Sequence, residues 1–98
     1  MRKKQIEEAY ALLKQIGIVR SESEFARNWL GKSESYLRCM RVKGTQPSNG
    51  AVAVCAARMQ ALAGDLARDP LTAAQSSAVL RVAYTMREQV LGAALDAA

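Results

Sequence analysis

Residues 29–44 read WLGKSESYLRCMRVKG, a short segment in which a tryptophan, a glycine and a tyrosine are followed by a basic stretch. Gly31 is a residue type that ends helices, and Ser33 is a good N-cap for a new helix. Behind that cap, Leu37 and Met40 are three apart and share one helical face. The positions away from that face are Ser35, Arg38, Cys39 and Val42. The segment therefore predicts a short helix that buries a small apolar face and exposes a polar, basic one.

Two further helices are predicted on the N-terminal side of this segment. The first runs from about Lys3 to Ile16, with apolar residues at helical spacing and Gly17 as its C-terminal cap. The second begins near Ser21, because a serine followed three residues later by Glu24 forms a capping-box pattern. It ends at Gly31. Its inward-facing residues are Phe25, Ala26, Trp29 and Leu30.

Two longer helices are predicted on the C-terminal side. Ser48 is the expected cap of a fourth helix, and its apolar stripe is formed by Val52, Cys55, Met59, Leu62 and Leu66. The Asp69-Pro70 dipeptide breaks that helix, and Thr72 with Gln75 forms a second capping box. A last helix follows and reaches Ala97. It carries two apolar stripes, one of Val79, Val82, Met86 and Val90 and another of Leu80, Leu91 and Leu95.

These elements predict an all-α fold, a compact helical domain of about five helices that contains a helix-turn-helix and ends in a long helix. The 98 residues, half of them hydrophobic, suffice for one small core built mainly from aliphatic side chains. Within this single structural domain, residues 1–68 form a helix-turn-helix DNA-binding-like unit. Residues 71–97 form the C-terminal helix, a candidate dimerisation element.

The composition argues against several classes of protein. The chain contains no histidine, and its two cysteines are sixteen residues apart, so no metal-ligand spacing is present and neither a metal nor a cofactor is expected. The sequence contains no paired carboxylates and no phosphate-binding glycine loop, so neither feature indicates an enzyme. No apolar run is long enough to cross a membrane, and the N-terminus lacks a signal-peptide pattern. We therefore expect a cytoplasmic protein that is not an enzyme.

Charge is distributed unevenly along the chain. Residues 1–47 contain ten lysines and arginines against five glutamates, whereas residues 48–98 carry four basic and four acidic side chains. The whole net charge of +5 therefore belongs to the N-terminal half. Such an asymmetry indicates a half that faces a polyanion and a neutral half that has a structural role, although a solvated basic face is the simpler alternative.

The segment EFARNWLGKSESYLRCMRVKGTQPS resembles the helix-turn-helix of phage repressors, whose pattern continues G-V-S-x-S-Y-I-S-x-I-x-x-G after the glycine of the turn. It is also similar to small uncharacterised bacterial proteins with a W-L-G-x-S-x-S-Y core. Two positions differ from the repressor pattern. Ala26 and Gly31 are five residues apart rather than four, and Lys32 occupies a place that is usually apolar.

The resemblance implies that the predicted short helix enters the major groove of double-stranded DNA. It places Ser33, Glu34, Ser35 and Arg38 against base edges, with the Arg38 guanidinium suited to guanine. It places the cationic residues Lys32, Arg41 and Lys43 against phosphates, and it gives Thr45 and Gln46 hydrogen bonds to the DNA backbone. Tyr36 is expected to be half-buried, with its hydroxyl in water.

Two functions remain open at this point. The first is a sequence-specific DNA-binding protein, a transcriptional regulator of bacterial, phage or plasmid type that acts as a homodimer. Its dimer interface would use the apolar excess of the last helix, namely Val79, Met86, Val90 and Leu91. The alternative is a helical protein–protein interaction module, an antiactivator or adaptor whose degenerate helix-turn-helix surface binds an acidic protein partner.

Overall fold

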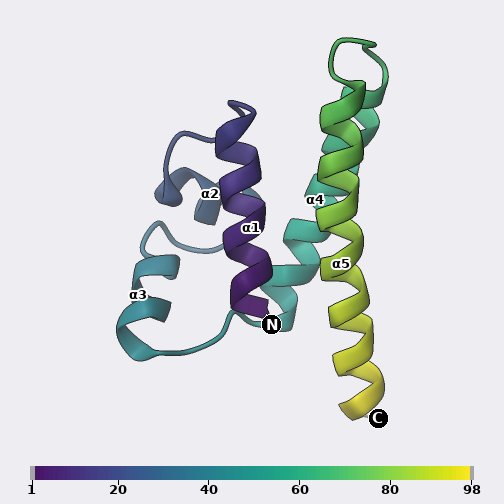
Figure 1. Cartoon of the computed structure of the whole chain (residues 1–98). Coiled ribbons are helices and arrows are strands. Elements are labelled where there is room, and N and C mark those ends of the chain that lie inside the picture. Colours follow the sequence, from purple (N-terminus) through teal and green to yellow (C-terminus); the bar gives the residue numbers. More distant parts are fainter. Residues whose placement is uncertain (1, 98) are drawn as a thin grey trace.

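The computed structural model describes residues 2–97, with side chains from 3 to 92, and within this range the fold is all-α (Figure 1). Its helices are α1 (Arg2–Gln15), α2 (Glu22–Trp29), α3 (Tyr36–Lys43), α4 (Asn49–Ala67) and α5 (Ala73–Ala97). Helices α4 and α5 run antiparallel and pack along each other, and α1 lies beside them. In Figure 1, α3 and α5 lie on opposite sides of α1. The predicted fold class is therefore confirmed.

The helix ends follow the predicted capping residues closely. Gly17, with φ +81°, ends α1. The Ser21 hydroxyl accepts a hydrogen bond from the Glu24 N–H at 3.2 Å, although the Glu24 carboxylate accepts from the Arg20 N–H (3.4 Å) rather than from Ser21. The Ser48 hydroxyl accepts from the Ala51 N–H at 3.1 Å and caps α4. Three of the helix boundaries are thus set locally, one by the left-handed backbone of Gly17 and two by the hydroxyls of Ser21 and Ser48.

The α4–α5 turn differs in detail from the prediction. Thr72 does mark the start of α5, because its carbonyl accepts the Ser76 N–H at 3.0 Å. Its hydroxyl, however, donates to the Leu66 carbonyl at 2.5 Å instead of forming the predicted capping box with Gln75. The carboxylate of Asp69 accepts the Leu71 N–H at 2.9 Å. The turn is therefore held by bonds to the end of α4.

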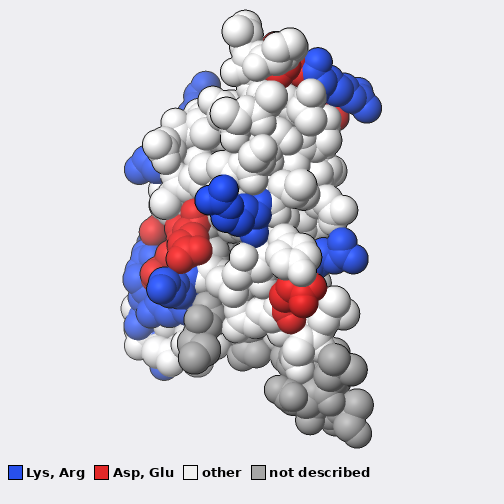
Figure 2. Space-filling model, turned by 45° about the vertical axis from the view of Figure 1, so that its right-hand side comes forward, with Lys and Arg blue, Asp and Glu red and all other residues white. Residues whose placement is uncertain are grey.

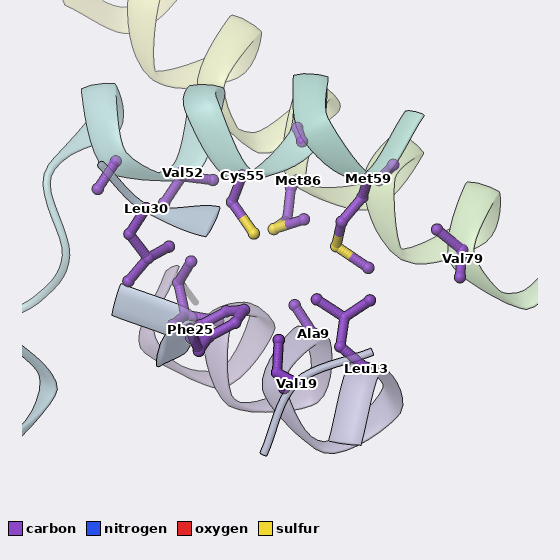
Figure 3. Packing of buried hydrophobic residues seen from close by; sticks show 14 of the residues in the cluster. Ala9, Leu13, Val19, Phe25, Leu30, Val52, Cys55, Met59, Val79 and Met86 are labelled. Carbon is purple, nitrogen blue, oxygen red and sulfur yellow. The ribbon is translucent and has the colours of Figure 1, made fainter. Parts of the chain in front are cut away.

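The core lies where α1, α2, α4 and α5 meet (Figure 3). Phe25 is fully buried and its ring lies 5.5 Å from the Tyr10 ring, centroid to centroid. Cys55 is buried among apolar side chains, and this burial raises the pKa of its thiol to about 12. Ser76 is a buried polar residue whose hydroxyl donates to the Ala63 carbonyl at 2.7 Å and so ties α5 to α4. The α4 stripe predicted from the sequence faces this core.

Two of the predicted dimer-interface residues belong to the same core. Val79 and Met86 are fully buried within the chain, so their assignment to an interface was wrong. Val90 is half-buried against the core, and Leu91 is exposed. The first apolar stripe of α5 was therefore needed by the monomer itself, because α1 and α4 both pack against that helix. The side chain of Leu95 lies outside the described residues.

Candidate nucleic-acid interface

Helices α2 and α3 are joined by a connection of residues 30–35 rather than by a tight turn. Gly31 adopts a left-handed conformation with φ +66°, and the Lys32 N–H donates to the Ala26 carbonyl at 3.0 Å, which ends α2. This geometry is compatible with glycine and costly for other residues. The first part of the connection therefore behaves as the sequence predicts.

The start of α3 differs from the prediction. The helix begins at Tyr36, and its N-cap is Ser35 rather than Ser33. The Ser33 carbonyl accepts the Tyr36 N–H at 3.1 Å, so a turn through Glu34 precedes the helix. Ser35 has φ −92° and ψ 6°, in the bridge region between helical and extended backbone, and its side chain makes no capping bond. The predicted base-facing residues Ser33, Glu34 and Ser35 thus lie in the turn before α3, at its N-terminal end.

Helix α3 has two distinct faces. Leu37 and Met40 are buried, and with Ile6 and Tyr10 of α1 they line a small cavity of about 30 Å³. The opposite face is exposed and consists of Arg38, Cys39, Val42 and Lys43. Gly44 ends the helix with φ +67°, and the Thr45 N–H donates to the Met40 carbonyl at 3.1 Å as in a Schellman motif. The predicted division of this helix into apolar and polar faces is confirmed.

Val42 is an apolar side chain on this exposed face, and it was not among the residues predicted to contact DNA. It is 82% exposed, far more than a valine that supports a core. Its position was readable from the sequence, because it lies five residues after Leu37 and so falls outside the buried stripe. An apolar side chain therefore stands among the basic residues of α3.

Arg41 is held by an acidic partner on α2. Its two terminal nitrogens donate to the two carboxylate oxygens of Glu22, at 3.0 Å and 2.6 Å. This bidentate contact lowers the pKa of Glu22, mainly through the hydrogen bonds and against a smaller opposing effect of burial. Arg41 was predicted to contact phosphate, and it would have to leave or share this partner to do so. Glu22 was not among the predicted site residues, although it is in the first turn of the preceding helix.

The remaining cationic side chains differ in what they contact. Arg38 and Lys43 have no ion-pair partner among the residues whose side chains the structure describes. The ammonium of Lys32 lies 5.7 Å from the centroid of the Tyr36 ring. Lys32 is exposed, so this position takes a lysine without burying its charge. Glu34 forms an exposed ion pair with Arg27 at 3.5 Å.

The loop after α3 is engaged with the rest of the fold. The Gln46 side-chain oxygen accepts the Lys3 N–H at 3.0 Å, near the N-terminus of α1. Tyr36 is half-buried, and its hydroxyl accepts the Ser48 N–H at 3.1 Å. The hydroxyl is therefore bonded within the protein, whereas the sequence predicted that it would lie in water. Thr45 is exposed. Of the two loop residues predicted to contact DNA, Gln46 is thus already used to fix the loop against α1.

A polar hollow of about 480 Å³ lies between α2 and α3. Its lining residues are Glu22, Ser23, Ser33, Glu34, Ser35, Arg38 and Arg41. Five of the nine predicted DNA contacts therefore meet in one place, whereas Lys32, Lys43, Thr45 and Gln46 lie outside this hollow. Figure 2 shows blue and red groups side by side at the lower left of the molecule, so the basic half carries acids among its bases.

Two other kinds of site are absent from the described residues. No group of three or more histidine, cysteine, aspartate or glutamate side chains is placed to hold a metal ion there. No helix in that part of the chain is both long and apolar enough to cross a membrane. Cys39 is exposed on α3, while Cys55 is buried, and both thiols are free.

Comparison with known proteins gives a family. A family model described as a family of unknown function, DUF6626, matches residues 6–96, which is almost the whole chain. The chain belongs to DUF6626. The match spans all five helices, so the long α4–α5 hairpin belongs to the family's domain as much as the α2–α3 unit does. No curated protein and no solved structure matches the chain.

Proposed function

We propose that the chain binds double-stranded DNA through α3 and acts as a small, homodimeric transcriptional regulator of bacterial, phage or plasmid type. The observation that carries this proposal is the outer face of α3. That face is supported from beneath by Leu37 and Met40 and presents Arg38 without an ion-pair partner among the described side chains.

The dimensions of α3 suit the major groove. An α-helix is about 10–12 Å in diameter with its side chains, and the major groove of B-DNA, which is about 12 Å wide, admits one such helix. Because α3 lies at the outside of the molecule, α1 and the α4–α5 hairpin would remain behind it and away from the duplex. The helix therefore has both the size and the position for insertion.

The exposed side chains match the chemistry of the groove. The Arg38 guanidinium can donate to both O6 and N7 of guanine, and Val42 can contact the methyl group of thymine. Lys43 and Lys32 lie beside this face and supply charge for the phosphates. Arg41 would join them when the bidentate contact to Glu22 opens. Specificity is thus assigned to Arg38 and Val42, and general affinity to the lysines.

The test is a mobility-shift titration of the full chain against a DNA pool selected from random duplexes and against an unselected pool, at several salt concentrations. We expect a selected consensus that binds at least about a thousandfold more tightly than the unselected pool. Equal, weak and steeply salt-dependent binding to both pools would instead indicate phosphate attraction alone. The absence of binding at low salt by the folded protein would contradict the proposal.

One observation favours a protein partner as the second candidate. Val42 is 82% exposed and Cys39 is exposed next to the basic residues of α3, while Glu22 and Glu34 line the adjoining hollow. An apolar centre surrounded by both charge signs is typical of a protein interface, and the acids weaken attraction to phosphate. A partner with an acidic helix would compete with DNA for this surface. Binding of such a partner by a chain that fails to bind duplex DNA would establish the second candidate.

A further inference from the structure

Helix α5 carries an exposed apolar stripe that the monomer does not cover. Leu80, Tyr84 and Leu91 are 48%, 64% and 52% exposed, and their spacing of four and seven residues places them on one side of the helix. Two open hollows adjoin the stripe. One, of about 330 Å³, is lined by Ser77, Leu80, Arg81 and Tyr84, and the other, of about 350 Å³, by Ala53, Ala57, Gln60, Arg87, Val90 and Leu91. The large side chains of the stripe therefore line these two hollows.

The charges that border the stripe are self-complementary in one orientation. Arg81 and Glu88 are both exposed, are seven residues apart, and have no ion-pair partner among the described side chains. In an antiparallel pair of α5 helices, each Arg81 faces the other copy's Glu88. In a parallel pair, these flanking side chains would lie on opposite sides of the interface, and no such ion pair would form. The charge order thus selects the antiparallel arrangement.

The apolar residues fit the same antiparallel register. When Arg81 opposes Glu88, Leu80 comes close to the other copy's Leu91, and Tyr84 comes close to its Arg87, a residue that Gln60 already orients through a 3.3 Å hydrogen bond. All three pairings share a centre between residues 84 and 86, so one twofold axis satisfies them together. A tyrosine beside an arginine is a favourable pair at an interface.

The distribution of charge between the two halves also favours a second copy as the occupant. Residues 48–98 carry equal numbers of basic and acidic side chains, whereas residues 1–47 carry the entire excess of +5. Two copies that meet through α5 therefore keep their basic halves apart. Figure 2 turns the α5 side forward and shows it to be largely uncharged, with isolated basic and acidic groups.

We propose that the outward face of α5 is a homodimer interface in which two copies pair antiparallel about a twofold axis near Thr85. Leu80, Tyr84 and Leu91 form its apolar centre, and two symmetric Arg81–Glu88 ion pairs set its register. The proposed function requires a homodimer, and this face of α5 would supply its interface. Leu80, Tyr84 and Leu91 take the place of the buried Val79 and Met86 as the contact residues. The interface does not depend on DNA binding.

The test is sedimentation velocity of the full chain without DNA, across the micromolar range, on the wild type and on charge-reversed variants. Arg81→Glu or Glu88→Arg alone sets like charges against each other at two places, and we expect each to weaken the dimer roughly tenfold or more. The double variant restores opposite charges with their positions exchanged, and we expect it to recover the wild-type association. Arg20→Glu, which makes the same charge change in the loop after α1, is the matched control and should dimerise normally.

Recovery in the double variant distinguishes pairing between copies from damage to one copy. Within a single helix the two side chains are about 10 Å apart along the axis, so an exchange of their charges has little effect on the monomer. A wild-type chain that stays monomeric, or a double variant that associates no better than the single ones, would overturn the proposal. So would single variants that dimerise as the wild type does. DNA binding by a monomeric chain would separate a failure of this interface from a failure of the proposed function.

Discussion

Helices α3 and α5 both bury one face and expose the other, but their exposed faces differ in chemistry. The eight-residue α3 exposes three basic side chains, Arg38, Arg41 and Lys43, together with Cys39 and Val42. The 25-residue α5 exposes Leu80, Tyr84 and Leu91 beside Arg81, Arg87 and Glu88. A face of the first kind suits a polyanion, and a face of the second kind suits another protein. The two halves of the chain therefore expose chemically different surfaces.

The largest expected difference between α5 and α3 is in how far a Met→Ala substitution lowers the free energy of unfolding. Met86 of α5 is fully buried in the main core, so Met86→Ala should lower the free energy of unfolding by about 2–5 kcal/mol. Met40 lies under α3 at the edge of the core with 5% exposure, and the same change there should cost about 2 kcal/mol or less. Urea unfolding followed by tryptophan fluorescence measures both. An equal or larger loss for Met40→Ala would mean that α3 is integral to the main core.

The next effect concerns the bond that joins α3 to α4. Tyr36→Phe removes the hydroxyl that accepts the Ser48 N–H, and we expect a loss of about 0.5–1.5 kcal/mol in the free energy of unfolding. Tyr84 of α5 is 64% exposed and is the matched control, since its hydroxyl makes no described hydrogen bond. Tyr84→Phe should leave the free energy of unfolding unchanged within error. Equal effects of the two changes would show that the Tyr36 bond contributes nothing.

A smaller effect follows from the Glu22–Arg41 ion pair. Both side chains are substantially exposed, so Glu22→Gln should cost about 1 kcal/mol or less at neutral pH. The pKa of Glu22 is lowered from 4.5, so the ion pair stabilises the fold above about pH 4.5 and this contribution is lost as the pH falls through the lowered value. Urea unfolding at pH 7 and pH 3 should show a gap between wild type and variant that closes in acid. A gap that persists at pH 3 would contradict this account of the pair.

The same substitution should strengthen DNA binding, because it removes an acid from the hollow and releases Arg41 toward phosphate. We expect a gain of a few-fold in affinity at low salt, measured by mobility shift on the selected sequence. Glu88→Gln removes the same charge from α5 and should leave DNA affinity unchanged for a given oligomeric state. Weaker binding by Glu22→Gln would mean that the ion pair positions Arg41 for DNA instead of withholding it.

The smallest effect is expected at Lys43, at the end of α3. Lys43→Ala should weaken binding to all DNA sequences alike and reduce the slope of log affinity against log salt by about 1. The base preferences of the selected sequence should not change. An altered preference would move Lys43 from a phosphate contact to a base contact.

The sequence predicted most of the fold because the determinants of its helices are local. Gly17, Ser21, Gly44 and Ser48 act through bonds to residues within a few positions, and such bonds are readable from spacing. What the sequence could not supply are the contacts between distant segments. The Glu22–Arg41 and Gln46–Lys3 contacts join residues 19 and 43 positions apart.

The same limit explains the errors on α5 and at the start of α3. Periodicity gave both stripes of α5, but only the packing of α1 and α4 against it decides that Val79 and Met86 are covered and Leu80 is not. For α3, two good capping residues, Ser33 and Ser35, lie two positions apart, and the turn closed by the Ser33 carbonyl selects the second of them. The exposed face of α3 was therefore predicted from the sequence, and the Glu22–Arg41 ion pair beside it was not.

The measurement that tests the central claim most directly is a parallel selection of random duplex DNA by the wild type and by Arg38→Ala. If α3 reads the major groove, the variant should remain folded and lose its preference at one base pair, at a cost of about 1–3 kcal/mol for the wild-type sequence. If both proteins select the same sequence, or neither selects any, α3 does not read DNA and its exposed face is a surface for another protein.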